Sequence, residues 1–328
     1  MNCNKTAVPI LLLVLALLLS CREVTEYYSK GFQQEYARPI SLMMSREFDA
    51  LNLSGQGIRI GVIDAGFGEF RTNPYTKDLL VLGCRDFVDN DTTGFFINES
   101  NHGTAVTKNI GGKYEGKVHG LAYQAGYYLA KTDLPDMEPK QDEIRLLRAI
   151  EWMIEEKVDV INISLGYTVF TDGSAYESKV LDGKTALSSR FIDSVLVLHP
   201  DLIVVISAGN EGDKQWRHIT VPSDVKDAIT VGSTDFDGKS RWESSGIGKE
   251  DVPYPKPDVA TYPTPTGNSY TAPVVAGLCA ALLEYKRVGR SRMKALLTGS
   301  GNHASNPDLE TGYGVPQTGN ILEKLQTD

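Results

Sequence analysis

The sequence is poor in cysteine, with four among its 328 residues. Cys3 and Cys21 lie near the N-terminus, which leaves Cys84 and Cys279 for the rest of the chain. Two thiols cannot form a framework of several disulfides, so the sequence differs from the small secreted domains that such frameworks stabilise. Cys279 lies in the apolar run 274–283, where we expect a buried side chain rather than a catalytic thiol.

The sequence also lacks a dense run of lysine or arginine. Its 33 basic and 42 acidic residues give a net charge of -9, so electrostatics do not attract it to nucleic acid. It contains no internal repeat and no low-complexity tract. With 41% hydrophobic residues, the chain has enough apolar surface for one sizeable core. These properties favour an ordinary globular protein whose partners are small neutral or basic peptides.

The apolar run at the N-terminus, Ala7–Leu19, is too short for a typical membrane-spanning helix. Its 13 residues would span only about 20 Å as a helix, against roughly 30 Å of bilayer hydrocarbon. Lys5 precedes the run and Ser20-Cys21 follows it at once, which is typical of a secretory signal peptide over residues 1–20. A lasting transmembrane anchor is the weaker alternative.

The end of this segment, Leu18-Leu19-Ser20-Cys21, resembles the lipobox of bacterial lipoproteins. The resemblance implies cleavage before Cys21, acylation of that residue, and attachment to a membrane through the lipid rather than through a spanning helix. We therefore expect an extracytoplasmic protein of a bacterial cell envelope, on the periplasmic face or at the cell surface. Ordinary cleavage after a small residue, with Cys21 incidental, is the alternative.

From about Gly57 onward, short β-branched runs alternate with segments of helical periodicity. This alternation predicts an α/β fold in three layers, with a mostly parallel sheet and helices on both faces. The strands expected are 58–63, 127–131, 158–165, 202–207 and 228–232, and the helices expected are 143–156, 188–198, 271–285 and 291–297. Residues 21–55 are polar and weakly patterned, which indicates a tether and lead-in, and one folded domain is expected over 56–328.

Asp64 and His102 occupy positions where polar side chains can act. Asp64 comes directly after the apolar strand expected over 58–63, and open α/β sheets hold ligands at the carboxyl ends of their strands. His102 precedes a segment in which the sequence predicts a helix over 105–110. It would therefore lie at a helix N-terminus, with backbone flexibility from Gly103. Each motif alone is weak, because Asp-x-Gly after a strand is usually a turn and a lone histidine usually has no catalytic role.

Ser269 lies in the segment Gly267-Asn268-Ser269-Tyr270-Thr271-Ala272-Pro273, ahead of an apolar helix. Pro273 fits the first turn of a helix, where backbone N–H groups have no intrahelical acceptor, so Ser269 is expected at the N-terminal end. There its backbone N–H and the helix dipole could bind a developing oxyanion. Asn210 follows the strand expected over 202–207, and its amide could donate to the same anion. An ordinary Asn-Glu-Gly turn is the alternative for Asn210.

Together these segments resemble the subtilisin-like serine peptidases. The order Asp, His, Ser along the chain is that of subtilisin and differs from the orders in chymotrypsin and the α/β-hydrolases. The stretch 158–166, which ends in Ser-Leu-Gly, also looks like a family strand, and the resemblance runs from about residue 40 to the C-terminus. It implies a serine endopeptidase in which Ser269 is the nucleophile, His102 the general base, Asp64 the residue that orients the histidine, and Asn210 an oxyanion donor.

The same resemblance implies where an extended polypeptide substrate binds. The backbone of Ser164, Leu165 and Gly166, with that of Asp133–Pro135, would pair with the substrate as an added strand. Ala208 and Gly209 would line the pocket for the residue before the cleaved bond. Glu211 lies near this pocket and could favour a basic side chain, but the same turn occurs in broad-specificity relatives. The residue preference therefore stays open.

Catalysis of this kind requires no cofactor, and we assign no metal ligands. The loop Asp89–Gly94 matches the first half of an EF-hand loop, but Ser100 stands where the bidentate Glu belongs, so a solvated turn is expected there. Structural calcium elsewhere stays open, because family members often carry it. We expect a monomer. Two other functions stay open, a catalytically silent lipoprotein that binds peptides and a processing protease of narrow specificity.

Overall fold

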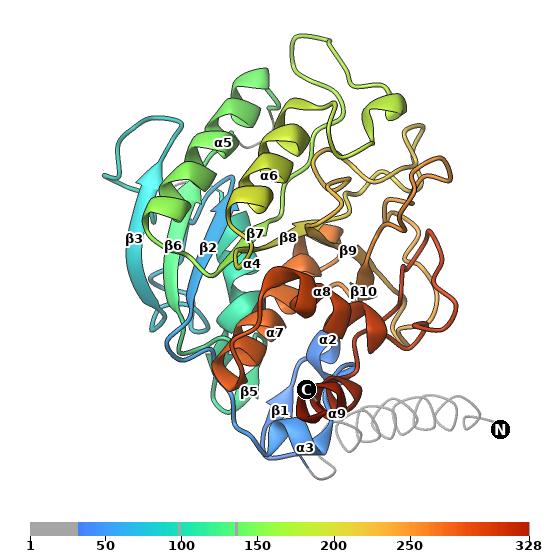
Figure 1. Cartoon of the computed structure of the whole chain (residues 1–328). Coiled ribbons are helices and arrows are strands. Elements are labelled where there is room, and N and C mark those ends of the chain that lie inside the picture. Colours follow the sequence, from blue (N-terminus) through green and yellow to red (C-terminus); the bar gives the residue numbers. More distant parts are fainter. Residues whose placement is uncertain (1–31, 98–99, 135–136, 328) are drawn as a thin grey trace, which may run out of the picture.

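The computed structural model describes residues 32–97, 100–134 and 137–327. Its centre is a sheet of seven parallel strands in the order β10-β9-β8-β7-β2-β6-β3 (Figure 1). The strands are β2 (Arg59–Asp64), β3 (Leu80–Asp86), β6 (Gly126–Lys131), β7 (Val160–Ile163), β8 (Ile203–Ser207), β9 (Ile229–Ser233) and β10 (Val259–Thr261). The expected parallel sheet is thereby confirmed.

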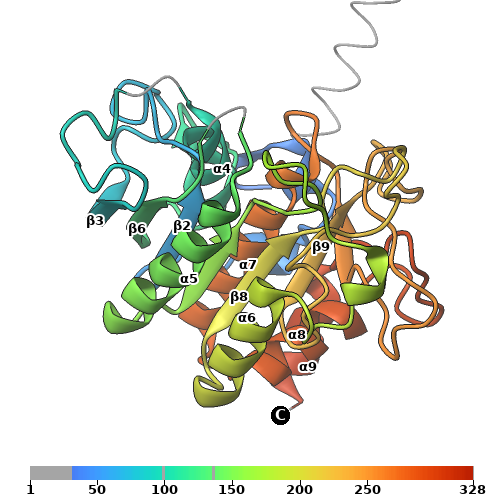
Figure 2. The ribbon, with the colours of Figure 1, turned by 90° about the horizontal axis from the view of Figure 1, so that it is seen from above.

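Helices cover both faces of the sheet (Figure 1, Figure 2). They are α4 (His102–Gly111), α5 (Lys140–Glu155), α6 (Leu187–Leu198), α7 (Ala272–Tyr285), α8 (Arg290–Gly299) and α9 (Thr318–Gln326). Ile60 and Val62 of β2 pack in one apolar cluster with α4 and α7, whereas Ile63 packs in a second cluster with α5 and α6. Because successive strand residues point to opposite faces, the central strands β2, β6, β7 and β8 contribute to both clusters. The three-layer α/β class is confirmed.

The expected and observed elements agree best where a strand is buried on both faces. β6 and β8 are buried along their whole length, so their apolar runs were visible in the sequence. β3 was not anticipated, because it lies at the edge of the sheet and exposes Leu80 and Leu82. Its burial pattern alternates between exposed and half-buried residues, and such a strand carries no continuous apolar run.

Residues 32–55 belong to the folded domain, which corrects the tether expected there. They form β1 (Glu35–Tyr36), α2 (Arg38–Ser41) and α3 (Arg46–Asp49). β1 joins a second, three-stranded sheet whose other members are β5 (Lys117–Val118) and β4 (Lys113–Tyr114). The buried side chains of this segment extend the main apolar core, and they include Tyr36, Ile40, Met43 and Phe48. Helices of four residues are too short to show a helical period in a sequence.

The predicted signal peptide and Cys21 lie outside the described residues. Within the three described ranges, no helix combines the length and the apolar composition that crossing a bilayer requires.

Candidate active site

The carboxyl ends of the central strands meet at one edge of the sheet and bring the predicted residues together. Asp64 ends β2, Asp133 follows β6, Ser164 follows β7 and Asn210 follows β8. β2 lies where the strand order changes direction, with β6 and β3 on one side and β7 to β10 on the other. Ligands of open α/β sheets bind at such a switch point. A cleft of about 550 Å³ lies there, and His102, Ser269 and Asn210 all line it.

Asp64 and His102 form a buried pair. The Asp64 side chain is fully buried, and its Oδ1 accepts hydrogen bonds from His102 Nδ1 at 2.6 Å and from the Ala65 N–H at 2.8 Å. The negative charge of Asp64 raises the pKa of His102 above its usual value, although burial opposes this shift. Because Nδ1 is engaged by the carboxylate, Nε2 is the ring nitrogen available on the cleft side.

A glycine allows the histidine to approach the end of β2. α4 begins at His102, and the Gly103 N–H donates to the Gly66 carbonyl at 2.8 Å. A β-carbon at position 103 would lie 2.7 Å from that oxygen and 2.9 Å from the Asp64 β-carbon. Any side chain there would push α4 away from β2. The role of Gly103 is therefore close approach, rather than the backbone flexibility that the sequence suggested.

Ser269 lies in the short 3-10 turn Asn268–Tyr270, directly before α7. α7 starts at Ala272 with Pro273 in its first turn, as expected from the sequence. The Ser269 hydroxyl donates to the Ser164 carbonyl at 3.2 Å, and the Ser164 hydroxyl donates to the Ser269 carbonyl at 2.8 Å. The Ser269 hydroxyl therefore has to rotate away from Ser164 before it can donate to His102, a rearrangement that is common before substrate binds.

Direct packing of α4 against α7 positions the histidine relative to the serine. Gly277 of α7 faces the Ile110 carbonyl of α4, and a β-carbon at position 277 would lie 2.5 Å from that oxygen. Tyr270 also packs beside the histidine, with its ring centroid 5.3 Å from that of His102. A larger residue at position 277 would separate the two helices and lengthen the distance between His102 and Ser269.

The Asn210 side chain is oriented by a neighbour of the serine. Its Oδ1 accepts a hydrogen bond from the Asn268 N–H at 2.8 Å. The Asn268 side chain is itself fixed, because its Nδ2 donates to the Gly209 carbonyl and its Oδ1 accepts from the Ser233 hydroxyl. With Oδ1 engaged, the Nδ2 donor of Asn210 is available to the cleft.

The cleft is acidic. Its described lining residues include Asp133, Glu138 and Glu211 and contain no lysine or arginine. Burial raises the pKa of Asp133 to about 8, although a hydrogen bond from Thr132 opposes this shift. Partial burial and the nearby carboxylates of Asp142 and Glu211 raise the pKa of Glu138 to about 7. Glu211 pairs with Lys214 at 2.9 Å.

Most of the expected substrate-binding residues line this cleft, with one exception. Ser164, Leu165, Gly166 and Gly209 line it, together with Asp133 and Leu134, whereas Pro135 lies outside the described residues. Ala208 is fully buried in an apolar cluster with Ile219 and Val221, which corrects its expected place in the pocket. The reason is the alternation of strand residues, which turns Ala208 inward at the end of β8.

Several lining residues were not anticipated, among them Met137, Glu138, Thr168, Val169 and Thr220. They come from irregular segments and match no motif, so only the fold brings them to the cleft.

The acidic loop after β3 is held by contacts within the chain. Asp89 accepts a hydrogen bond from Lys131 at 3.1 Å, and Asp91 accepts one from the Thr93 N–H at 2.8 Å. Across residues 32–97, 100–134 and 137–327, no group of three or more His, Cys, Asp or Glu side chains is arranged to hold a metal ion.

A buried Asp–His pair, a serine before a helix and an amide donor in one cleft are the arrangement that serine hydrolases of the Asp-His-Ser type use. Residues 55–315 match the model of the subtilase family. The protein therefore belongs to the subtilase family, the subtilisin-like serine peptidases.

Comparison with individual proteins gives the same class. The minor extracellular protease Epr of Bacillus subtilis (strain 168) is 26% identical over 303 residues, which cover 88% of this chain but 42% of that protein. Subtilisin DY of Bacillus licheniformis is 27% identical over 270 residues, which cover 79% of this chain and 89% of that protein. The solved structure of the CspB protease of Clostridium perfringens has a TM-score of 0.70 at 16% identity, and the match covers 87% of this chain and 96% of that chain. This last likeness concerns the fold.

Proposed function

We propose that the protein is a serine endopeptidase that hydrolyses peptide bonds in extended polypeptides through Asp64, His102 and Ser269. The observation that carries the proposal is the 2.6 Å hydrogen bond between His102 Nδ1 and Asp64 Oδ1, beside a cleft that Ser269 also lines. This bond leaves Nε2 of the histidine to accept a proton. Membership of the subtilase family supports the same function.

In the first step, His102 Nε2 takes the proton of the Ser269 hydroxyl while Oγ attacks the carbonyl carbon of the scissile bond. The imidazolium then gives this proton to the leaving amine as the C–N bond breaks, which leaves an acyl group on Ser269. Water, activated by the same histidine, attacks the ester, and the acid product leaves as Ser269 regains its proton. Asp64 accepts the hydrogen bond from Nδ1 throughout and stabilises the imidazolium.

The negative oxygen of each tetrahedral intermediate requires hydrogen-bond donors. Asn210 Nδ2 and the backbone N–H of Ser269 are the two that we assign. The hydrogen bond between Asn210 Oδ1 and the Asn268 N–H supports this role, because it fixes the amide before substrate arrives. Donors that are fixed in advance stabilise a developing charge without reorganising during the reaction.

The substrate would lie extended between two segments of the cleft wall. The backbone of Ser164–Gly166 would pair with it on one side and that of Asp133 and Leu134 on the other, as an added strand. Both segments line the cleft that contains Ser269, which supports this path.

Cleavage of an internally quenched peptide library tests this function. The wild-type protein should cleave peptides internally, and Ser269→Ala should lose roughly 10⁴-fold to 10⁶-fold in kcat, the range measured for triad residues in subtilisin itself. Ser194→Ala, an exposed serine on α6, is the matched control and should keep full activity. Equal cleavage by wild type and Ser269→Ala would refute the proposal, and a folded wild type that binds the peptides without cutting them would favour the silent peptide-binding lipoprotein.

The same library distinguishes a peptidase of broad specificity from a narrow processing protease, because it reports how many sequences are cut.

We further propose that the protein acts outside the cytoplasm, anchored to the envelope by lipid on Cys21, as the Leu18-Leu19-Ser20-Cys21 motif suggests. Metabolic labelling with a radioactive fatty acid should mark the wild type and not Cys21→Ser. Equal labelling of the two would refute the anchor.

A further inference from the structure

Two backbone walls bound the part of the cleft beside the proposed oxyanion donors. One wall is the segment that ends in Gly166, after β7, and the other contains Gly209, after β8. Both walls and Ser269 line the same cleft. On the substrate path proposed above, the side chain that precedes the cleaved bond would enter between the two glycines. This placement of the substrate side chain rests on the proposed function.

Thr220 occupies the space between these two glycines. A β-carbon on Gly166 would collide with Thr220 Oγ1, and a β-carbon on Gly209 would lie 2.6 Å from the same oxygen. The Thr220 side chain is therefore in contact with both walls and forms the floor where they converge. The Thr220 side chain thus limits the depth of this pocket.

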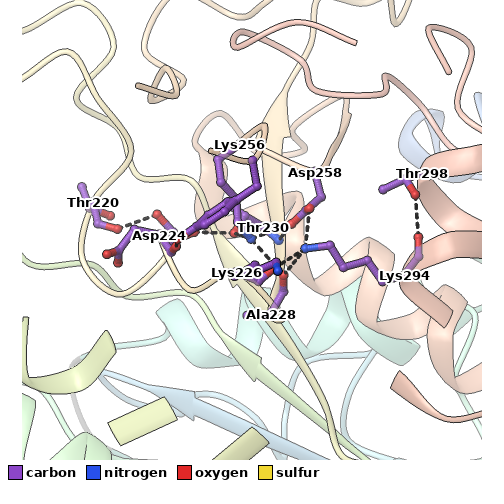
Figure 3. Close-up of polar contacts among 11 residues, drawn as sticks. Thr220, Asp224, Lys226, Ala228, Thr230, Lys256, Asp258, Lys294 and Thr298 are labelled. Atoms are coloured by element: carbon purple, nitrogen blue, oxygen red, sulfur yellow. Dashed lines mark hydrogen bonds and ion pairs between the residues drawn. The ribbon is translucent and has the colours of Figure 1, made fainter. Parts of the chain in front are cut away.

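The position of Thr220 is fixed by hydrogen bonds into the core. Its N–H donates to the Ala208 carbonyl at 3.2 Å, and its carbonyl accepts from the Ser223 hydroxyl. The Thr230 hydroxyl donates to the Ser223 carbonyl and accepts from Lys256 Nζ at 2.9 Å, so a buried chain of hydrogen bonds runs from Thr220 to the lysine (Figure 3). A floor held in this way cannot retreat to admit a large side chain.

The Thr220 hydroxyl is also unsatisfied. Thr220 is only 4% exposed, and its Oγ1 has no hydrogen-bond partner among the described residues. A buried hydroxyl without a partner is unfavourable, so it marks a position where a ligand can supply one. Rotation about the Cα–Cβ bond exchanges the hydroxyl and the methyl group between staggered positions, which lets the hydroxyl turn toward the pocket.

A basic side chain is the competing occupant of this pocket. Glu211 lines the same cleft, but its carboxylate already binds Lys214 at 2.9 Å. A lysine or arginine side chain would also need a pocket deeper than the one that Thr220 closes. The geometry therefore disfavours a long cationic side chain immediately before the cleaved bond, even though the rest of the cleft is acidic.

We propose that Thr220 is a specificity-determining residue, which restricts the position before the cleaved bond to short side chains and favours serine over alanine through its unpaired hydroxyl. Leucine, phenylalanine and lysine are excluded by the closed floor. A hydrophobic pocket distinguishes side chains that differ by one methylene only about 10-fold to 200-fold, and a blocked pocket distinguishes larger differences more strongly.

The test compares wild type, Thr220→Gly and Thr220→Val on quenched peptides that differ only in the residue before the cut, which is Ser, Ala, Leu, Phe or Lys. Wild type should cleave the Ser and Ala peptides at least about 100-fold faster, in kcat/KM, than the Phe peptide. Thr220→Gly should raise kcat/KM for Phe and Leu by about 10-fold to 100-fold without raising it for Ala. Thr220→Val keeps the shape and should lower the ratio of Ser to Ala by about 5-fold to 10-fold, because it lacks the hydroxyl.

Fluorophosphonate labelling of Ser269 in each variant separates the peptidase function from the specificity role of Thr220. The probe reacts with the nucleophile and carries no amino-acid side chain that would have to enter the pocket. Thr327→Gly, at an exposed helix end, controls for the general effect of a Thr→Gly change. A labelled wild type that prefers Phe or Lys, or a labelled Thr220→Gly with an unchanged ranking, would overturn the role of Thr220 while the peptidase stands. An unlabelled, folded wild type would overturn both.

If Thr220→Gly fails to fold, Thr220→Ser replaces it and should admit Leu more readily than wild type does.

Discussion

Two fully buried aspartates, Asp258 and Asp133, differ in how the chain surrounds them. Asp258 accepts hydrogen bonds from Lys256 at 2.7 Å, from Lys294 at 2.6 Å and from the Thr230 N–H at 2.8 Å (Figure 3). The two cations lower its pKa, although burial opposes this shift. Asp133 has only Thr132 and Tyr167 as described hydrogen-bond partners, and burial raises its pKa to about 8.

The difference separates a scaffold from a site. In the cluster around Asp258, side chains of the protein satisfy each charge, so the cluster connects β9, β10 and α8 and offers nothing to a ligand. At the cleft, buried polar atoms are left without partners among the described residues, and these include Asp64 Oδ2 and Thr220 Oγ1. Groups that the chain leaves incomplete are the ones that a substrate or a reaction can use.

Of the changes that distinguish the two regions, Asp258→Asn should lower the free energy of unfolding the most. It removes the negative charge from between two lysines and leaves Lys256, which is 2% exposed, without its counter-ion. Removing one partner of a buried ion pair costs about 3 to 5 kcal/mol, so urea denaturation should show a loss of this size in the free energy of unfolding. Lys294→Ala, which removes a partly exposed partner, should cost less.

The folded fraction of Asp258→Asn should still label with a fluorophosphonate at the wild-type rate. If the variant unfolds at the same urea concentration as the wild type, or stays folded but does not label, the cluster is not a scaffold.

A somewhat smaller effect, on rate alone, is expected at Asn210. Asn210→Asp keeps the acceptor for the Asn268 N–H but replaces the Nδ2 donor by an oxygen, whereas Asn210→Ala removes both. Loss of one oxyanion donor lowers kcat by about 10²-fold to 10³-fold, a figure that comes from subtilisin itself. Steady-state kinetics should show this loss in both variants with little change in the free energy of unfolding. An active Asn210→Asp would mean that the side chain only anchors Asn268.

The third prediction is a change in how stability depends on pH, and it concerns Asp133. Its pKa is about 8 in the folded protein and close to the usual 3.8 when unfolded, so the folded state holds the extra proton between these values. Stability from this group therefore falls as pH rises from about 4 to about 8. Asp133→Asn should flatten this slope when unfolding is measured across that range.

Asp251→Asn provides a control of opposite sign. Asp251 is exposed, and a hydrogen bond from Lys249 lowers its pKa, so its small contribution is lost as pH falls. If Asp133→Asn leaves the pH dependence unchanged, the carboxyl is ionised in the folded protein and the contrast with Asp258 is wrong.

The sequence predicted the centre of the fold better than its margins. Strands such as β8, buried on both faces, show continuous Val and Ile runs, so their existence and parallel arrangement followed from the pattern. The segment 32–55 and the edge strand β3 did not stand out. The first consists of a two-residue strand and helices of four residues, and the second has three exposed residues among its seven and no continuous apolar run. Local patterns report burial on two faces well and burial on one face poorly.

The same limit applies to the site. Asp64, His102, Asn210 and Ser269 could be proposed because each lies in a recognisable setting at a strand end or a helix start. Thr220 could not, because its position depends on how three distant segments meet. Chemical groups can be recognised in a sequence, whereas the shape of a pocket depends on contacts between residues far apart in the chain.

The most direct test of the central proposal is the site of covalent labelling by a fluorophosphonate. The folded wild type is treated with the probe, digested and mapped by mass spectrometry. We predict a single adduct on Ser269 that is absent from Ser269→Ala and strongly reduced in His102→Ala. A folded wild type that takes up no label, or a label that persists in Ser269→Ala, would contradict the proposal that Ser269 is the nucleophile.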